Sequence, residues 1–182
     1  DQYDPKQITL SDSFDDDLNK KPEVLQRMRE VWSGLDESDW KKVVTSYYAS
    51  LTSIDTEIGR VINLLKEKNL YENTVIVFTS DHGDMMGAHG LLTKGVATGY
   101  EEVYNIPLII KTPNDGHPDN TADIKVNTVD IFPTLLNYAG AETPSAIHGK
   151  RLLPVIKNSH DGAEWTGSYA EFLAQRFMYT QS

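Results

Sequence analysis

A long stretch of helical periodicity constrains this sequence more than any other feature. Apolar residues recur at three- and four-residue spacing over residues 40–65, so one face of a single long helix is apolar. Asp36 or Ser38 is suited to cap its start, and Asn69 stands where a left-handed residue would close it. A stripe of this length must be covered by other parts of the fold. We therefore expect a core-facing helix packed on a sheet.

Two short apolar runs supply the expected sheet. Residues 74–79 form a continuous β-branched run that predicts a strand covered on both faces. Residues 107–110, ending at Lys111, predict a second strand of the same kind. Between them, a glycine-rich loop is followed by residues 95–105, which are expected to carry a short helix.

The remaining elements alternate in the same way. Residues 22–32 predict a short helix with Pro22 in its first turn, and residues 124–128 predict a strand. Residues 129–139 predict a helix that ends before Gly140. Helices and strands in alternation predict the α/β class, a sheet flanked by helices.

Composition excludes several kinds of partner. The net charge of −10 argues against nucleic acid, which needs a basic surface. There is no cysteine, hence no disulfide, thiolate ligand or thiol nucleophile in these 182 residues. No apolar stretch approaches the ~20 residues that span a bilayer, so no membrane span is expected. The run Asp15-Asp16-Asp17 suggests a metal site, but it is interpreted as a solvated loop or helix start, because like charges without spaced partners are usually hydrated.

The stretch TSDHGDMMGAHG, residues 79–90, follows the first predicted strand directly. Ligands of open α/β sheets bind beyond the carboxyl ends of strands, where Asp81 and His82 stand. Gly83 provides the freedom for a turn that brings a carboxylate and an imidazole to one cation. Such donors suit zinc, manganese or another transition ion better than calcium. The alternative is that Asp81 caps a turn and His82 is a hydrogen-bonded histidine at a strand end.

Further polar residues follow in the same loop. Lys94 would be suited to bind an oxyanion that also touches a cation, and its alternative role is that of an exposed surface lysine. His89 adds another polar group, and Asp84 is interpreted as a residue that shapes the loop.

The segment Val-Ile-Val-Phe-Thr-Ser-Asp-His-Gly-Asp-Met-Met-Gly-Ala-His-Gly-Leu-Leu-Thr-Lys-Gly, residues 75–95, strongly resembles the sulfatases of the alkaline phosphatase superfamily. The likeness extends to Tyr-Glu-Glu with Asn-Ile-Pro-Leu-Ile-Ile (residues 100–110), Val-Asp-Ile-Phe-Pro-Thr-Leu-Leu (129–136) and His-Gly-Lys-Arg-Leu-Leu-Pro (148–154). The resemblance implies part of a sulfatase-like mixed sheet flanked by helices.

The resemblance also assigns roles to individual residues. Asp81 and His82 match the family's ligands to one divalent cation, usually calcium and sometimes manganese or magnesium. Lys94 matches the lysine that contacts the sulfate group. His89 lies in the family's Gly-x-His-Gly pattern, where substrate contact and loop hydrogen bonding are both open. The implied reaction is metal-dependent hydrolysis of a sulfate ester, with sulfated carbohydrate as a plausible substrate, and the pattern looks bacterial.

One departure from the family pattern defines the expected extent of the chain. The nucleophile of sulfatases is a formylglycine made within a Cys/Ser-x-Pro-x-Arg motif, and this sequence has no such motif. We therefore expect the later part of a sulfatase catalytic domain, inactive alone, whose partner is the N-terminal half that carries formylglycine. The expected boundaries are an inter-half loop with a short helix (1–35), the later half of the α/β domain (36–160) and the start of a C-terminal subdomain (161–182).

Two other functions are alternatives. A phosphodiesterase or phosphonate hydrolase of the same superfamily shares the Asp-His-Gly triplet, but a two-metal phosphatase needs further ligands. The later histidines are His117, His148 and His160, for which surface roles are expected. A non-catalytic oxyanion-binding module would lack a nucleophile, yet it would have no reason to keep Asp81, His82 and Lys94 together.

Overall fold

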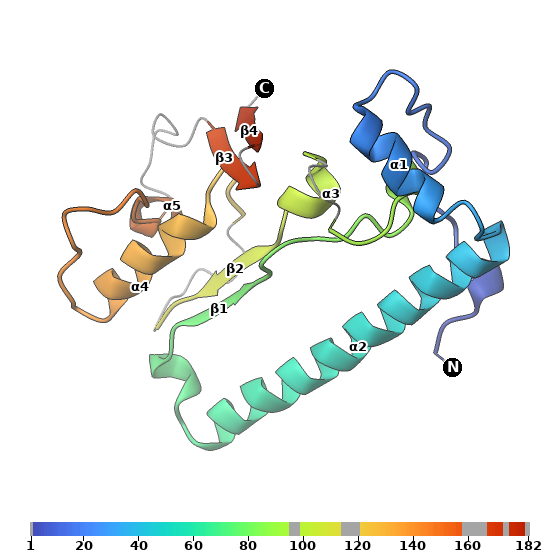
Figure 1. Ribbon diagram of the computed structural model, residues 1–182. Coiled ribbons are helices and arrows are strands. Elements are labelled where there is room, and N and C mark those ends of the chain that lie inside the picture. The colour runs from blue at the N-terminus through green and yellow to red at the C-terminus, as the bar shows by residue number, and fades with distance from the viewer. Residues whose placement is uncertain (1, 95–98, 114–120, 158–166, 173–174, 181–182) are drawn as a thin grey trace. The chain divides into compact units, whose positions relative to one another are not determined.

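The computed structural model in Figure 1 describes residues 2–94, 99–113, 121–157, 167–172 and 175–180. The chain divides into two compact units, each described here by itself. The first comprises Asp1–Glu72 and Phe78–Ile109, and the second comprises Asn73–Val77 and Ile110–Ser182.

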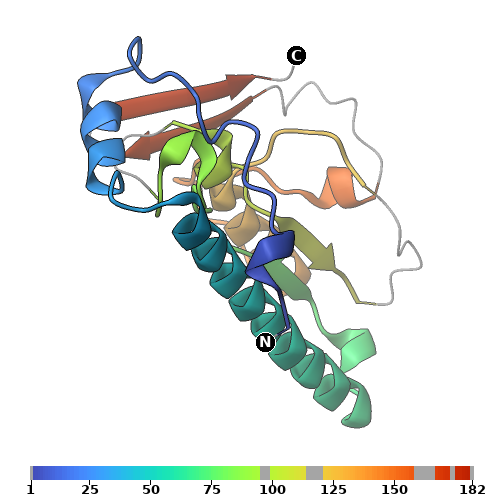
Figure 2. The same cartoon turned by 90° about the vertical axis from the view of Figure 1, so that its right-hand side faces the viewer.

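The helices of the first unit begin and end close to where the sequence predicts. A 3₁₀ turn, η1 (Pro5–Gln7), precedes α1 (Glu23–Val31) and the long α2 (Glu37–Glu67), which both views show as one unbroken helix (Figures 1 and 2). Asp36, rather than Ser38, is the N-cap of α2, because its carboxylate accepts a hydrogen bond from the Asp39 backbone. Asn69 has φ 56° just beyond the helix, which confirms the predicted left-handed residue.

Only the start of the apolar stripe on α2 is fully covered by the described residues. Trp40 and Val44 are buried, and Trp40 packs edge-on against Phe14. Leu51, Ile54 and other apolar residues farther along α2 are exposed. Farther along, Ile58, Ile62 and Leu65 are half-buried, and Tyr3 contacts Tyr48 and Thr52. The expectation of a fully core-facing helix is therefore met fully only over the first turns of α2, and in part beyond them.

Both predicted strands are present and are shifted by one or two residues. The turn η2 (Tyr71–Asn73) leads into β1 (Ile76–Thr79), and β2 (Leu108–Lys111) is its neighbour in a two-stranded sheet. The expected short helix is α3 (Glu101–Tyr104). Phe78 and Ile109 are exposed, so the prediction of strands covered on both faces is not met by the described residues.

The second unit contains one correction to the sequence analysis. Residues 124–128 are not a strand. Instead, Asn127 caps the turn η4 (Thr128–Asp130), where its backbone donates to the Asp130 carboxylate in a reciprocal capping box. The Asn127 side chain also accepts a hydrogen bond from the Tyr169 backbone, so these polar groups are engaged in a cap and not in a strand ladder.

The rest of the second unit follows the predicted order. The helix α4 (Ile131–Tyr138) ends before Gly140, whose φ is 66°, and α5 (Leu153–Ile156) follows. The strands β3 (Gly167–Phe172) and β4 (Gln175–Thr180) lie side by side in both views as an antiparallel pair. Helices and strands together confirm the α/β class. Among the described residues, no helix combines the length and the apolar character needed to cross a bilayer.

Asp130 is the polar anchor of the second unit. It is 3% exposed, and its two carboxylate oxygens accept hydrogen bonds from the Asn127 and Lys150 backbones at 2.8 and 2.7 Å. The Asp130 carbonyl accepts from the buried Thr134 hydroxyl, which in turn accepts from the Leu152 backbone. These bonds join η4 and α4 to the segment before α5.

Replacing Asp130 by alanine should destabilise the protein, because two backbone N–H groups lose their acceptor. We expect the free energy of unfolding to fall by about 2 kcal/mol or more in urea denaturation. Asp55→Ala, at an exposed site on α2, is the control and should change it by about 0.5 kcal/mol at most. Equal effects of the two substitutions would contradict the anchoring role.

Candidate functional site

The glycine-rich loop contributes directly to the apolar core of the first unit. Met85, Ala88 and Leu91 are buried in one cluster with Leu18, Leu25 and Val103. Met85 is 2% and Leu91 0% exposed. The buried side chains therefore hold the loop in the apolar core, and this fixes the places of its polar residues.

Asp84 shapes this loop, as the sequence analysis expected. Its Oδ1 accepts hydrogen bonds from the Met86 and Thr93 backbones, both at 3.0 Å. Met86 and Thr93 have φ values of 40° and 66°, in the left-handed region that non-glycine residues seldom adopt. The Asp84 carboxylate holds the two ends of the loop together across these unusual turns.

Gly83 is required by a close approach of backbone. Its N–H donates to the Val103 carbonyl at 2.8 Å, and a Cβ at this residue would collide with the Glu102 carbonyl oxygen. The backbone of α3 therefore lies directly against the residue that follows His82. Only glycine leaves enough space for this contact.

Asp81 and His82, the two residues that the sequence analysis predicts as ligands of one cation, lie side by side at the end of β1. The Nδ1 of His82 lies 2.8 Å from the Gly83 carbonyl oxygen, and because a carbonyl only accepts, Nδ1 carries the proton of this hydrogen bond. The other ring nitrogen, Nε2, lies 3.6 Å from Oδ2 of Asp81. Two atoms that bind the same cation at about 2.0–2.5 Å lie roughly 3–4 Å apart. The pair therefore fits two places in a coordination shell.

The electrostatics of Asp81 suit such a role. Its carboxylate is 86% exposed, and the hydrogen bond from the His82 backbone at 2.9 Å is the main cause that lowers its pKa, with attraction by the His82 ring second. A lowered pKa means that the carboxylate remains ionised at lower pH than an ordinary aspartate does.

Within the described part of the chain, no hydrogen bond or ion pair joins the other candidate residues to this pair. No third histidine, aspartate or glutamate joins Asp81 and His82 to form a metal-binding group among the residues that the structure describes. Lys94 is exposed beyond Thr93 and makes no ion pair within the described part of the chain. His148 is exposed, whereas His117 and His160 lie outside the described residues.

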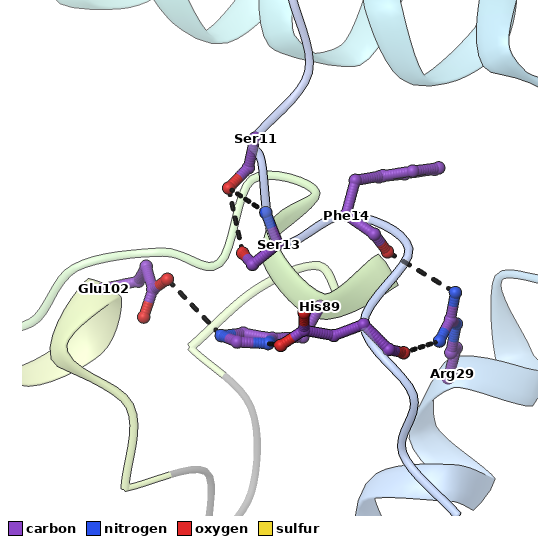
Figure 3. A network of polar contacts seen from close by, with 7 residues as sticks. Ser11, Ser13, Phe14, Arg29, His89 and Glu102 are labelled. Atoms are coloured by element: carbon purple, nitrogen blue, oxygen red, sulfur yellow. Dashed lines mark hydrogen bonds and ion pairs between the residues drawn. The ribbon is translucent and has the colours of Figure 1, made fainter.

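His89 is held by residues from two distant segments (Figure 3). Its side chain is 11% exposed, with Nδ1 2.7 Å from Asp16 Oδ2 and Nε2 3.5 Å from Glu102 Oε1. The ring stacks on Tyr100, with centroids 3.9 Å apart. Burial raises the pKa of Tyr100, and the carboxylates of Asp16 and Glu102 raise it further.

Sequence reasoning missed the partners of His89. Asp15, Asp16 and Asp17 are exposed, as the interpretation of this run as a solvated loop expects, but Asp16 also pairs with a histidine 73 residues later. Arg29, on α1, donates to the Asp16 and Phe14 carbonyls and packs against Gly90. No local pattern reports such a pairing, because the residues meet only after the chain has folded.

Gly83→Ala should destabilise the first unit, since the new Cβ forces α3 away from the loop. We expect the free energy of unfolding to fall by about 1–3 kcal/mol. Gly59→Ala is the matched control on α2, where a Cβ meets no atom within 4 Å, and should raise it by about 0.5–1 kcal/mol. Chemical denaturation of both variants tests the pair, and a stabilising Gly83→Ala would refute the close approach.

Comparison with known proteins gives a consistent result. The family model described as Sulfatase matches residues 2–141. The sulfatase YidJ of Escherichia coli is 36% identical over 146 residues, which cover 80% of this chain and 29% of the relative. The N-acetylglucosamine-6-O-sulfatase of Bacteroides thetaiotaomicron is 38% identical over 129 residues, or 69% of this chain and 23% of the relative.

A solved structure shares the fold. The phosphonate monoester hydrolase SpPMH from Silicibacter pomeroyi aligns with a TM-score of 0.83 and 28% identity, over 93% of this chain and 35% of the solved one. The chain thus spans between about a quarter and a third of the length of the proteins that it matches.

Proposed function

Because this chain belongs to the sulfatase family of the alkaline phosphatase superfamily, we propose that Asp81 and His82 bind a divalent cation and that Lys94 binds the sulfate group of an ester substrate. The observation that carries the proposal is the orientation of His82. Its Nδ1–H bond to the Gly83 carbonyl leaves Nε2 with a lone pair, 3.6 Å from an exposed carboxylate oxygen. Two acceptor atoms facing each other in this way are compatible with a cation between them.

The metal is proposed as calcium on the grounds of family resemblance, with manganese or magnesium as alternatives. A bound divalent cation would stabilise the negative charge that develops on the sulfuryl oxygens. Within the chain, Asp81 contributes a carboxylate held ionised by the His82 backbone, and His82 contributes a ring fixed in one tautomer. Lys94 contributes a positive charge on the exposed side of the loop, where it is available to an anion.

The proposed reaction of the whole protein is hydrolysis of a sulfate ester. The sequence has no Cys/Ser-x-Pro-x-Arg motif, so the formylglycine nucleophile belongs to residues other than these 182. The relatives are several times longer than the part that they share with this chain, which is compatible with that assignment. The name of the Bacteroides relative, an N-acetylglucosamine-6-O-sulfatase, supports sulfated carbohydrate as the class of substrate.

Replacing the proposed site residues should abolish most of the activity of the full-length protein toward an arylsulfate. We expect Asp81→Asn and Lys94→Ala each to lower kcat/KM by about 10²-fold, because each removes a charge that faces the transition state. Asp15→Asn and Lys20→Ala remove charges of the same sign at exposed sites and are the matched controls. The 182-residue chain alone should show no turnover, and metal-dependent hydrolysis by it would overturn the assignment of the nucleophile.

A phosphonate monoester hydrolase activity is the second candidate, favoured by the structural likeness to SpPMH. Comparing kcat/KM of the full-length protein for a sulfate ester and a phosphonate monoester with the same leaving group decides between the two. The sulfatase proposal requires the larger value for the sulfate ester.

A further inference from the structure

His89 occupies a site where both ring nitrogens face a carboxylate. The contact with Asp16 is a hydrogen bond of 2.7 Å, and the contact with Glu102 is a longer ion-pair distance of 3.5 Å. The ring therefore lies between two acidic side chains that would otherwise repel each other. The ring is nearly parallel to Tyr100, at an interplanar angle of 15°, which holds it between them.

The backbone of His89 is fixed as firmly as its ring. His89 has φ 58° and ψ 20°, a left-handed conformation, and its N–H donates to the Ser13 carbonyl at 3.0 Å. Arg29 donates to the Asp16 carbonyl at 2.6 Å, and its Nε lies 2.7 Å from where a Cβ at Gly90 would be. Residues 13–16 are therefore held through carbonyl groups by Arg29 and through a carboxylate by His89.

A short series of contacts leads from His89 to His82. Glu102, whose carboxylate faces His89, also presents its carbonyl oxygen to Gly83 in the close approach described above. Val103, the next residue, accepts the hydrogen bond of the Gly83 N–H. The Gly83 carbonyl then accepts from His82 Nδ1 and determines which nitrogen of His82 remains open. Each step is a direct contact within the first unit.

We propose that His89 is a positioning residue, which holds Glu102 and thereby keeps α3 against Gly83 so that Asp81 and His82 face the same point. The inference rests on the proposed role of Asp81 and His82 as metal ligands. Removal of a partner that orients a ligand typically weakens metal binding by about 10–100-fold, even though the partner never touches the metal. His89 thus acts through α3 and has both of its nitrogens engaged away from a substrate.

The variants separate this role from general stability. Glu102→Gln removes the carboxylate charge without a change of size, and Glu101→Gln, one residue earlier and exposed, is its control. Asp16→Asn is compared with Asp15→Asn in the same way. At residue 89, asparagine and glycine both tolerate the left-handed backbone, but only asparagine retains a donor near the place of Nδ1. His89→Asn is therefore the conservative variant, and His89→Gly removes the side-chain donor completely.

Two measurements are made on the full-length protein that contains these residues. Amide hydrogen exchange compares the Gly83 and Met85 amides with amides in the middle of α2, which serve as an internal reference. Mn²⁺ alone is titrated in, and the paramagnetic broadening of the His82 imidazole signals is followed. The titration gives the Mn²⁺ concentration at which half of the sites are occupied, even where binding is weak. Asp81→Asn is included to test whether the broadening arises at the proposed ligands.

We expect Mn²⁺ to broaden the His82 signals of the wild-type protein and Asp81→Asn to lose this effect. Glu102→Gln and His89→Gly should raise the Mn²⁺ concentration needed for half-occupancy by about tenfold, and they should speed exchange of the Gly83 amide. In both measurements, His89→Asn should lie between His89→Gly and the wild type. The controls Glu101→Gln and Asp15→Asn should stay within about twofold of the wild type.

Three results would overturn the inference, and they differ from one another. If Asp81→Asn abolishes the broadening while Glu102→Gln and His89→Gly match the controls, the metal proposal stands and positioning by His89 is refuted. If Asp81→Asn leaves the broadening unchanged, the metal proposal itself fails, and the inference fails with it. If the variants speed exchange equally at Gly83 and throughout α2, His89 contributes only general stability.

Discussion

Burial of the glycine-rich loop is the constraint on which the rest of the first unit depends. Met85 and Leu91 lie in the apolar cluster, so the loop cannot move away from α1 and α3 without exposing them. Burying two such side chains stabilises the loop by about 1.5–3 kcal/mol each. The polar residues between them are consequently directed outward or toward partners at fixed places. A loop with so many glycines gains its order from this packing and not from regular secondary structure.

The two histidines of the loop illustrate how burial separates roles that a sequence pattern leaves open. His82 is partly exposed, with one nitrogen bound to a backbone carbonyl and the other facing the Asp81 carboxylate. His89 is nearly buried, with a carboxylate at each nitrogen and an aromatic ring against its face. A partly exposed pair with an open ring nitrogen suits ligand binding. A nearly buried ring with a carboxylate at each nitrogen suits structural positioning. The same residue type therefore has two different environments seven residues apart.

In the second unit, a buried carboxylate, that of Asp130, holds separate segments together. Asp130 is buried, and its oxygens accept backbone hydrogen bonds from the turn before α4 and from Lys150, so the charge is compensated locally. Gly149 has no room for a side chain, because the Val129 carbonyl lies against it. Two family-like segments, residues 129–136 and 148–154, are joined by these contacts.

The sequence by itself determined the longer helices and the first two strands, because periodicity and caps are local. It predicted α1, α2 and α4, both strands of the first pair, the cap at Asp36 and the left-handed Asn69, and it placed Asp81 beside His82. It failed at residues 124–128, where Asn127 bonds to Asp130 in a cap, and it missed the partner of Asp16, which is 73 residues away. Only the tertiary structure decided which nitrogen of His82 is open, what His89 contacts and why residue 83 must be glycine. Those outcomes depend on distances between segments far apart in the chain, which no local pattern encodes.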